Sequence, residues 1–233
     1  MSVQEQFAEA GDALPILTKS FGLAPAAARP QVTHSRHLQA ALKRLLDLAI
    51  AVPMLILLAP LLAVVAIFIK IDSAGPAMFR QSRLGLNGQA FGILKFRTMN
   101  VVEDGDAVVQ AGRNDARVTR IGAFLRTTSI DELPQLLNVI TGDMSLVGPR
   151  PHAIAHDIHY ASLIPEYVQR QRVKPGITGW AQVNGYRGGT PTLDLMQSRI
   201  DLDIWYADHA SAALDLAILV RTPLELLRNR NVY

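Results

Sequence analysis

The stretch "LAIAVPMLILLAPLLAVVAIFI", residues 48–69, decides how this chain is placed. Its 22 residues hold no charged or strongly polar side chain, and about 20 apolar residues are enough to cross a bilayer as a helix. One transmembrane helix is therefore the simplest interpretation. A buried core helix is a weaker one, because a core helix of a small domain needs only one apolar face.

Two features of this stretch argue against a simple span. Pro53 and Pro60 lie inside it, and each proline lacks a backbone N–H and disturbs the preceding turn. Both flanks are also basic, with Lys43 and Arg44 before the stretch and Lys70 after it, although basic residues mark the cytoplasmic side of a membrane segment. A re-entrant helix, broken near Pro60 and entering and leaving on one face, satisfies both observations. The residues alone leave the re-entrant helix and the plain span open.

Composition limits the remaining choices. The chain has 233 residues, 49% of them hydrophobic, with a net charge of +3 and no cysteine. This charge does not demand a nucleic-acid partner, and the absence of cysteine excludes a disulfide scaffold and any thiolate metal site. Residues 1–37 are rich in Ala and Pro, without the pattern of a signal peptide, and are expected to form a flexible leader. The expected organisation is this leader, a membrane helix at 38–71 and a cytoplasmic domain at 72–233.

Residues 78–99 predict a β-hairpin. "MFRQSR" and "FGILKFRTM" flank "LGLNGQ", in which Asn87-Gly88 is a strong turn signal. Side chains alternate along a strand, so Lys95 and Arg97 are expected on one face, roughly 7 Å apart. They could form a solvated strand edge or contact a diphosphate.

The rest of the chain alternates loops and helices. Residues 100–116 are polar and predict a loop, and the stretch from 142 is punctuated by Gly and Pro. The portion at 193–228 has a helical pattern and is apolar and basic, which suits a membrane surface or a core.

The segment "SIDELPQLLNVITGDMSLVGPRP", residues 129–151, carries the candidate chemistry. Ser129 and Glu132 have the spacing of a capping box, and apolar residues follow at helical spacing, so Glu132 could serve as a cap alone. Asp131 is expected in the first turn, where the helix dipole favours the ionised form by roughly 0.3–1 kcal/mol. An ionised, oriented carboxylate is a usable nucleophile.

Adjacent acids suit a division of labour. A glycosidase pair flanks a bond from opposite sides, whereas neighbours on a helix point about 100° apart, so that one can attack while the other holds a cation. Mg²⁺ takes one or two carboxylates together with substrate phosphates. Arg150 lies between two prolines that fix its backbone, and guanidinium suits phosphate recognition.

These residues resemble the bacterial sugar transferases, the monotopic polyprenyl-phosphate hexose-1-phosphate transferases that start exopolysaccharide assembly. The similarity runs from "KRLLDLAIAV" at Lys43 to "DLAILVRTPLELL", with the landmarks "GPAMFRQSRLGLNGQAFGILKFRTM", "TRIGAFLRTTSIDELPQLLNVITGDMSLVGPRP" and "VKPGITGWAQVNG". The resemblance implies an α/β catalytic domain on the cytoplasmic face of the inner membrane. Its single N-terminal membrane helix would be re-entrant and broken at Pro60, although Ala59 stands where relatives often have Ser. The chain resembles the minimal form of the family, without a further N-terminal region.

The resemblance also implies the reaction. A phosphosugar moves from a UDP-sugar to undecaprenyl phosphate, with UMP released and Mg²⁺ as cofactor. Asp131 would form a covalent phosphosugar intermediate, and Glu132 would hold Mg²⁺. Arg150 would bind phosphate and Arg126 would support the surroundings of the two acids. The other positions that match the family's site are Lys95, Arg97 and, with a less defined role, Asp203.

The donor and the competing classes remain to be weighed. "GWAQVNGYRGG" resembles the branch that uses UDP-glucose, although Gly189 stands where that branch has an acid, and UDP-galactose is the alternative. A non-enzymatic membrane-anchored protein would need only the cap and would explain neither the basic strand nor Arg150. A glycosyltransferase or hydrolase of another kind would need separated acid and base groups, which the sequence does not offer. Membrane lipid is an expected partner, and a homodimer is left open.

Overall fold

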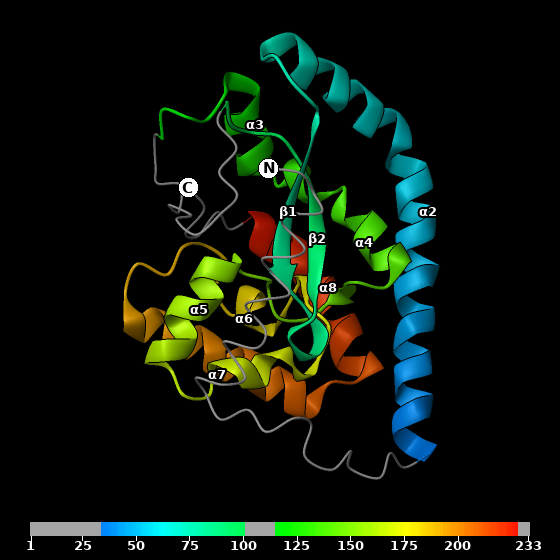
Figure 1. The fold of residues 1–233 in the computed structure, drawn as a ribbon. Helices are drawn as coiled ribbons and strands as arrows, with labels where there is room; N and C mark the ends of the chain where they lie inside the picture. Colours follow the sequence, from blue (N-terminus) through cyan, green and yellow to red (C-terminus); the bar gives the residue numbers. More distant parts are fainter. Residues whose placement is uncertain (1–33, 101–114, 228–233) are drawn as a thin grey trace.

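The computed structural model describes residues 34–100 and 115–227. The predicted leader lies outside these residues except for 34–37, and most of the predicted loop at 100–116 lies outside them too. The described chain is a mixture of helices and two small sheets (Figure 1), in agreement with the expected α/β domain.

The apolar stretch lies within one helix, α2 (His34–Asp72), which is 39 residues long. Its segment Leu38–Asp72 has an 18-residue window of mean hydropathy 2.9, of which only 11% is buried inside the protein, so by length and composition it can cross a membrane. This exposure argues against the buried core helix. Pro53 and Pro60 lie inside α2 without ending it, so the predicted break is not an interruption of the helix. Figure 1 shows α2 following one side of the domain and bending over α3 in its later turns, and a proline bends a helix when its neighbours keep their hydrogen bonds.

The predicted hairpin is confirmed. Strand β1 (Met78–Leu84) pairs antiparallel with β2 (Ala90–Phe96), and Met78 lies opposite Phe96. The connection contains a short 3₁₀ turn, η1 (Leu86–Gly88), in which Asn87 and Gly88 have φ of 53° and 75°. Asn and Gly tolerate these left-handed conformations, which is why the pair marks the turn.

Short elements complete the domain. They are α3 (Arg120–Thr128), η2 (Ile130–Glu132), α4 (Gln135–Thr141), β3 (Ser145–Val147), α5 (Ile154–Leu163), η3 (Tyr167–Arg172), β4 (Gly176–Thr178), α6 (Trp180–Val183), α7 (Leu193–His209) and α8 (Ala212–Leu227). Strands β3 and β4 form a parallel pair, with Ser145 opposite Gly176. The helical pattern predicted at 193–228 corresponds to two helices, α7 and α8.

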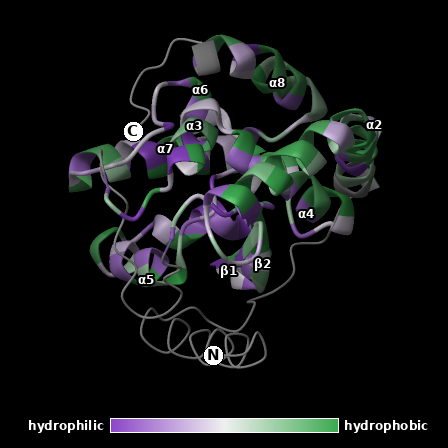
Figure 2. Cartoon of the chain, turned by 90° about the horizontal axis from the view of Figure 1, so that it is seen from above, coloured by the Kyte–Doolittle hydropathy of each residue, from purple (hydrophilic) through white to green (hydrophobic). Residues whose placement is uncertain are grey.

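The core packs the domain against both halves of α2. Ala51 of α2 belongs to a cluster with buried residues of β2, α4, β3 and α8. Val65 and Ile69, further along the same helix, pack with Phe96 and Leu125 in a second cluster. Figure 2 shows α2 at the edge of the domain, predominantly apolar in colour. The helix thus contacts the domain along its length while its other side stays uncovered.

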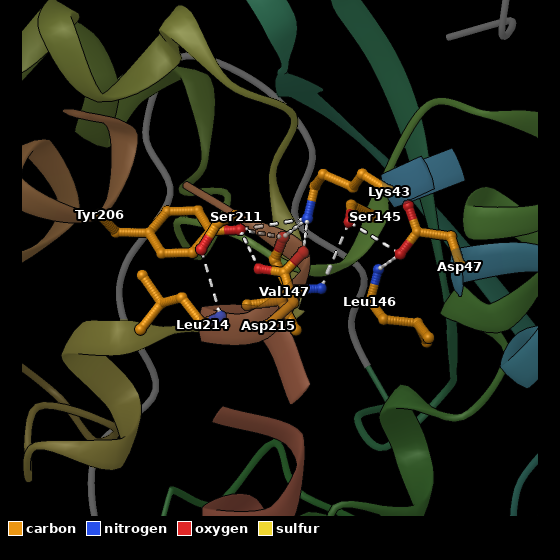
Figure 3. A network of polar contacts seen from close by, with 9 residues as sticks. All are labelled: Lys43, Asp47, Ser145, Leu146, Val147, Tyr206, Ser211, Leu214 and Asp215. Carbon is orange, nitrogen blue, oxygen red and sulfur yellow. Dashed lines mark hydrogen bonds and ion pairs between the residues drawn. The ribbon is translucent and has the colours of Figure 1, made fainter. Parts of the chain in front are cut away.

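Polar contacts fix the start of α2 to strand β3 (Figure 3). Lys43 Nζ donates to the Val147 carbonyl at 3.0 Å and pairs with Asp215 at 2.6 Å. Asp47, a buried residue directly before the membrane stretch, accepts from the Ser145 hydroxyl and the Leu146 N–H, both at 2.9 Å. Strand β3 leads directly into Gly148-Pro149-Arg150, so this helix supports the loop that carries the predicted phosphate-binding arginine.

Candidate active site

The two adjacent acids lie in a turn between two helices. Helix α3 ends at Ser129, whose φ of 58° places it in the left-handed region, and Asp131 and Glu132 follow in η2. The Ser129 side chain makes no cap hydrogen bond to η2 and instead accepts from Arg187. The capping box predicted from Ser129 and Glu132 is therefore wrong. The backbone turns sharply at Ser129, where α3 ends, and the Glu132 carboxylate binds Lys95 and Arg150 instead.

Glu132 is held by two cations from distant parts of the chain. Lys95 Nζ on β2 lies 2.9 Å from its Oε1. Arg150, in the loop after β3, donates from Nη1 to Oε2 at 2.9 Å and from Nη2 to Oε1, a bidentate arrangement. Such paired charge-assisted bonds are among the strongest that side chains form. The side chains of Lys95, Glu132 and Arg150, all predicted site residues, are therefore held together at one place.

The pKa values of the two neighbouring carboxyl groups are shifted in opposite directions. Burial acts against ionisation of Glu132, but Arg150 and Lys95 more than offset it and hold the pKa of this carboxyl well below its usual range. Burial, and then the charge of Glu132, raise the pKa of Asp131 to about 6. The helix dipole was expected to favour ionised Asp131. Burial prevails instead, because Asp131 is only 9% exposed and the helix that follows the turn is seven residues long.

The Asp131 carboxylate accepts no hydrogen bond from the residues that the structure describes. Arg126, in the last turn of α3, lies near enough to lower its pKa, as do Lys95 and Arg150. A buried carboxylate without donors, surrounded by cations, keeps its lone pairs available for attack on an electrophile. Arg126 therefore lies near Asp131, and its role in supporting the two acids stays a prediction.

Two predicted site residues lie elsewhere. Arg97 donates to the Ser73 carbonyl at 2.7 Å, to its hydroxyl at 2.9 Å and to the Ala74 carbonyl, so it secures the chain just after α2. The strand ends at Phe96, and the alternation that should place Lys95 and Arg97 on one face does not continue past it. Asp203 is buried on α7 and pairs with Arg170 at 2.7 Å, away from the two acids.

Arg187 is a site residue that the sequence reasoning did not single out. It lies in the loop after α6 and its guanidinium donates to the Ser129 hydroxyl, two residues before Asp131. Burial, followed by the charge of Arg150, lowers its pKa, and Glu132 and Asp131 act in the opposite sense. The signal was a lone arginine in the glycine-rich stretch "NGYRGG", since such loops often carry function.

The residues fit a magnesium ion in kind and number. Among the described residues no three His, Cys, Asp or Glu side chains gather as a protein-only metal site. Mg²⁺, however, is commonly bound by one or two carboxylates and substrate phosphates, and Asp131 and Glu132 are adjacent carboxylates. Both oxygens of Glu132 are engaged by cations, so a metal would share this group once phosphates offer Lys95 and Arg150 another anion.

The arrangement is suited to phosphate chemistry. Four cationic side chains from four segments surround one ionised carboxylate and one available carboxylate: Lys95, Arg126, Arg150 and Arg187. Cations placed around a reacting phosphoryl group stabilise its charge, and the free carboxylate can attack it. A helix cap alone would require none of these long-range contacts.

Known proteins share most of the described sequence. Residues 38–229 match the family model described as bacterial sugar transferase. A UDP-glucose:undecaprenyl-phosphate glucose-1-phosphate transferase of Caulobacter vibrioides is 56% identical over 82% of this chain and 72% of its own length. The Escherichia coli protein of the same name is 48% identical, again over 82% of this chain. A UDP-N-acetylgalactosamine-undecaprenyl-phosphate N-acetylgalactosaminephosphotransferase of Aeromonas hydrophila is 42% identical over 78% of it.

The matched lengths differ between these relatives. The match covers 41% of the Escherichia coli protein and 42% of the Aeromonas hydrophila protein, so this chain spans less than half of either. The family model nevertheless matches the whole of the site, from Lys95 to Arg187. On this family match and these identities, the chain belongs to the bacterial sugar transferase family.

Proposed function

We propose that this protein moves hexose 1-phosphate from a UDP-sugar to undecaprenyl phosphate, with UDP-glucose as the first donor to test. The observation that carries the proposal is the pair of unlike carboxylates: Glu132 is clamped by Lys95 and Arg150, while Asp131 beside it is free of hydrogen bonds from the described residues. The names of the Caulobacter vibrioides and Escherichia coli relatives support glucose. The Aeromonas hydrophila relative supports an N-acetylhexosamine as the second candidate.

Asp131 is the nucleophile of the first step. Its carboxylate oxygen forms a bond to the β-phosphorus of the donor, and the bond from this phosphorus to the bridging oxygen breaks. The electron pair leaves with UMP. In the second step an oxygen of undecaprenyl phosphate attacks the same phosphorus, the acyl phosphate bond breaks, and the Asp131 carboxylate is restored. Two successive displacements at one carboxylate give ping-pong kinetics.

The cations position the phosphates and balance their charge. Arg150 and Lys95 already bind one anion, the Glu132 carboxylate. When the donor binds, they donate some of their hydrogen bonds to its diphosphate instead. Arg187 and Arg126 bring further positive charge to the side of Asp131. Glu132 would hold Mg²⁺, which supplies additional positive charge to the diphosphate when it is bound.

We further propose that α2 is re-entrant and that the domain lies on the cytoplasmic face of the inner membrane. Both ends of the helix contact the same domain: Lys43 pairs with Asp215 near the start, and Asp72 accepts from the Ile121 N–H at 3.1 Å at the end. The basic residues at both ends favour the cytoplasmic side. This membrane placement and the proposed reaction are supported by different observations. The placement rests on the contacts of α2, and the reaction rests on the two acids in η2.

The reaction is tested by following UMP release with undecaprenyl phosphate and Mg²⁺ in lipid. A panel of UDP-glucose, UDP-galactose and UDP-N-acetylgalactosamine identifies the donor. Asp131→Asn should abolish release, whereas Asp201→Asn, at an exposed position of α7, should leave it unchanged. Without acceptor, a donor labelled in its β-phosphate should leave label on the wild-type protein and none on Asp131→Asn. A folded Asp131→Asn protein that still turns over would contradict the assignment of the nucleophile.

A further inference from the structure

Two arginines of the site, Arg150 and Arg187, lie in loops rather than in helices or strands. A loop can hold a side chain in one direction only if its own backbone is fixed. In both loops a buried arginine supplies a bond to a backbone carbonyl. Arg170 donates from Nη2 to the Arg150 carbonyl at 2.6 Å, and Arg199 donates to the Gly188 carbonyl, next to Arg187.

Arg170 is itself held from one side by Asp203. Its Nε and Nη2 lie 2.9 and 2.7 Å from the same carboxylate oxygen, Oδ2. Both side chains are 3% exposed, and burying such a pair is favourable only when its geometry is good and its other donors are satisfied. The remaining nitrogen, Nη1, lies 3.4 Å from the Tyr167 hydroxyl and 3.3 Å from His152 Nδ1. The guanidinium thus has one orientation, with one edge on Asp203 and one N–H directed at the Arg150 carbonyl.

The loop of Arg150 depends on this bond because of its sequence. Pro149 and Pro151 have no backbone N–H with which to anchor it. The Pro149 carbonyl accepts from the Gly176 N–H at 2.9 Å, which fixes the start of the loop, and the bond from Arg170 fixes its centre. The Arg150 side chain extends from this fixed backbone, and its guanidinium donates to both oxygens of Glu132.

We propose that Asp203 and Arg170 are positioning residues, which hold the Arg150 backbone so that its guanidinium meets Glu132 and the donor phosphates. They act on the substrate through Arg150 and touch neither acid. This assignment replaces a direct site role for Asp203, and it rests on the proposed function because it takes Arg150 as a phosphate-binding group.

Helix α7 provides an internal comparison. Arg199 and Asp203 are four residues apart and therefore lie on one face of the helix, yet they serve different loops. Asp203 supports Arg150 by way of Arg170, whereas Arg199 supports the loop of Arg187 directly. Loss of Asp203 should thus be coupled to Arg150, and loss of Arg199 should be coupled to Arg187.

The test is a double-mutant cycle on donor kinetics in lipid. Asp203→Asn should raise the KM for the donor and lower kcat/KM by about 10- to 100-fold, the size of effect that a misplaced binding group produces. In an Arg150→Ala background, Asp203→Asn should change these constants by less than about twofold, because contacts that act through one residue are not additive. In an Arg187→Ala background it should keep its full effect. Equal losses with and without Arg150 would overturn the proposal.

Two further variants separate positioning from general structural damage. Asp203→Glu keeps the charge and should recover part of the kcat/KM that is lost in Asp203→Asn. If Asp203→Asn and Arg170→Lys both leave donor KM at the wild-type value, the proposal fails. Asp208→Asn removes the pair that Arg172 and Asp208 form at 2.8 Å between the same two elements, η3 and α7. That pair is about half exposed, and its loss should not alter the kinetics.

The wild-type protein is the reference: if it releases UMP from no donor, the proposed function fails and this proposal fails with it. If the wild type is active but the losses in kcat/KM from Asp203→Asn and Arg150→Ala are additive, only the positioning role is contradicted.

Discussion

At the scale of single residues, the surroundings of Asp131 and Glu132 matter more than their being acids. Lys95 and Arg150 hold Glu132 ionised, and the negative charge of Glu132 contributes to the raised pKa of Asp131. In the proposed reaction, the donor phosphates would draw Lys95 and Arg150 away from Glu132, and that carboxylate would then be available to a cation. The same two side chains can therefore stabilise the site without substrate and bind the substrate when it arrives.

Arg150 and Arg97 allow a direct comparison of a site arginine with a structural one. Arg150→Lys cannot reproduce the bidentate contact with Glu132 or a fork on phosphate, so kcat/KM for the donor should fall by about 10- to 100-fold. Arg97→Lys should lower the unfolding temperature, because its guanidinium serves the Ser73 and Ala74 carbonyls, and should leave donor KM unchanged. Initial rates and thermal unfolding of both variants give the comparison.

Exposed Arg172 supplies the control for these two substitutions. Arg172→Lys alters a pair with Asp208 that is about half exposed, and pairs of this kind contribute little, so rate and unfolding temperature should both stay at the wild-type values. If donor KM rises as much in Arg97→Lys as in Arg150→Lys, Arg97 takes part in donor binding and is not only a structural residue.

The residues of the site were predictable to the extent that their roles depend on type and close spacing. The two acids and the proline-flanked arginine stand out in one short segment, and Lys95 was expected on a basic strand. Arg97 was expected on one face with Lys95, but β2 ends at Phe96, before it. Arg187 was not singled out, because its place in the site depends on where a loop returns. The contact of Arg187 with Ser129 joins positions 58 residues apart, and no local pattern reports such a contact.

At the scale of elements, a capping box at Ser129 and an amphipathic helix after it were expected; the turn η2 and then the helix α4 follow Ser129. Ser129 belongs to the end of α3, where its left-handed conformation reverses the chain. Helix α3 packs closely against the chain at Thr98, and this requires Gly122, because a Cβ there would lie 2.1 Å from the Thr98 carbonyl oxygen. The hairpin was predictable, since Asn87 and Gly88 suffice to mark its turn, whereas the junction of α3 and η2 is set by packing between segments far apart in the sequence.

The first turns of α2 are expected to stabilise β3 and the loop after it. Asp47 is 4% exposed and accepts from the Ser145 hydroxyl and the Leu146 N–H. Asp47→Ala leaves both donors buried without a partner, which should lower the free energy of unfolding by about 1–3 kcal/mol. Chemical unfolding in detergent, followed by circular dichroism, measures the change.

A second aspartate provides the control for this experiment. Asp201→Ala removes an exposed side chain that accepts from Gln197 within α7, and the free energy of unfolding should change by less than about 0.5 kcal/mol. Equal stability of the Asp47→Ala and Asp201→Ala proteins would mean that α2 does not support β3 through this carboxylate.

At the scale of the whole molecule, the domain contacts α2 at both ends and leaves its outer face uncovered. Side chains on this face are strongly exposed, among them Ile56, Leu57 and Ile71, at 70, 79 and 75%. A helix that crossed the bilayer once would carry one of its ends away from the domain, whereas Asp72 and Lys43 both bind it. Contact at both ends thus favours the re-entrant arrangement, and Pro60 provides the position for a bend.

The absence of cysteine from this chain makes this topology directly measurable by labelling introduced thiols. Ala40→Cys and Ala74→Cys place exposed thiols near the two ends of α2, Leu57→Cys places one on its apolar middle, and Glu166→Cys marks the domain. With a membrane-impermeant maleimide, a re-entrant helix predicts that both end positions and the domain position react only in inside-out vesicles. The thiol at position 57 should react in neither orientation, because it would lie in hydrocarbon. Reaction of the two end positions from opposite sides would establish a single span, and the domain would then contact only the half of α2 that lies on its own side.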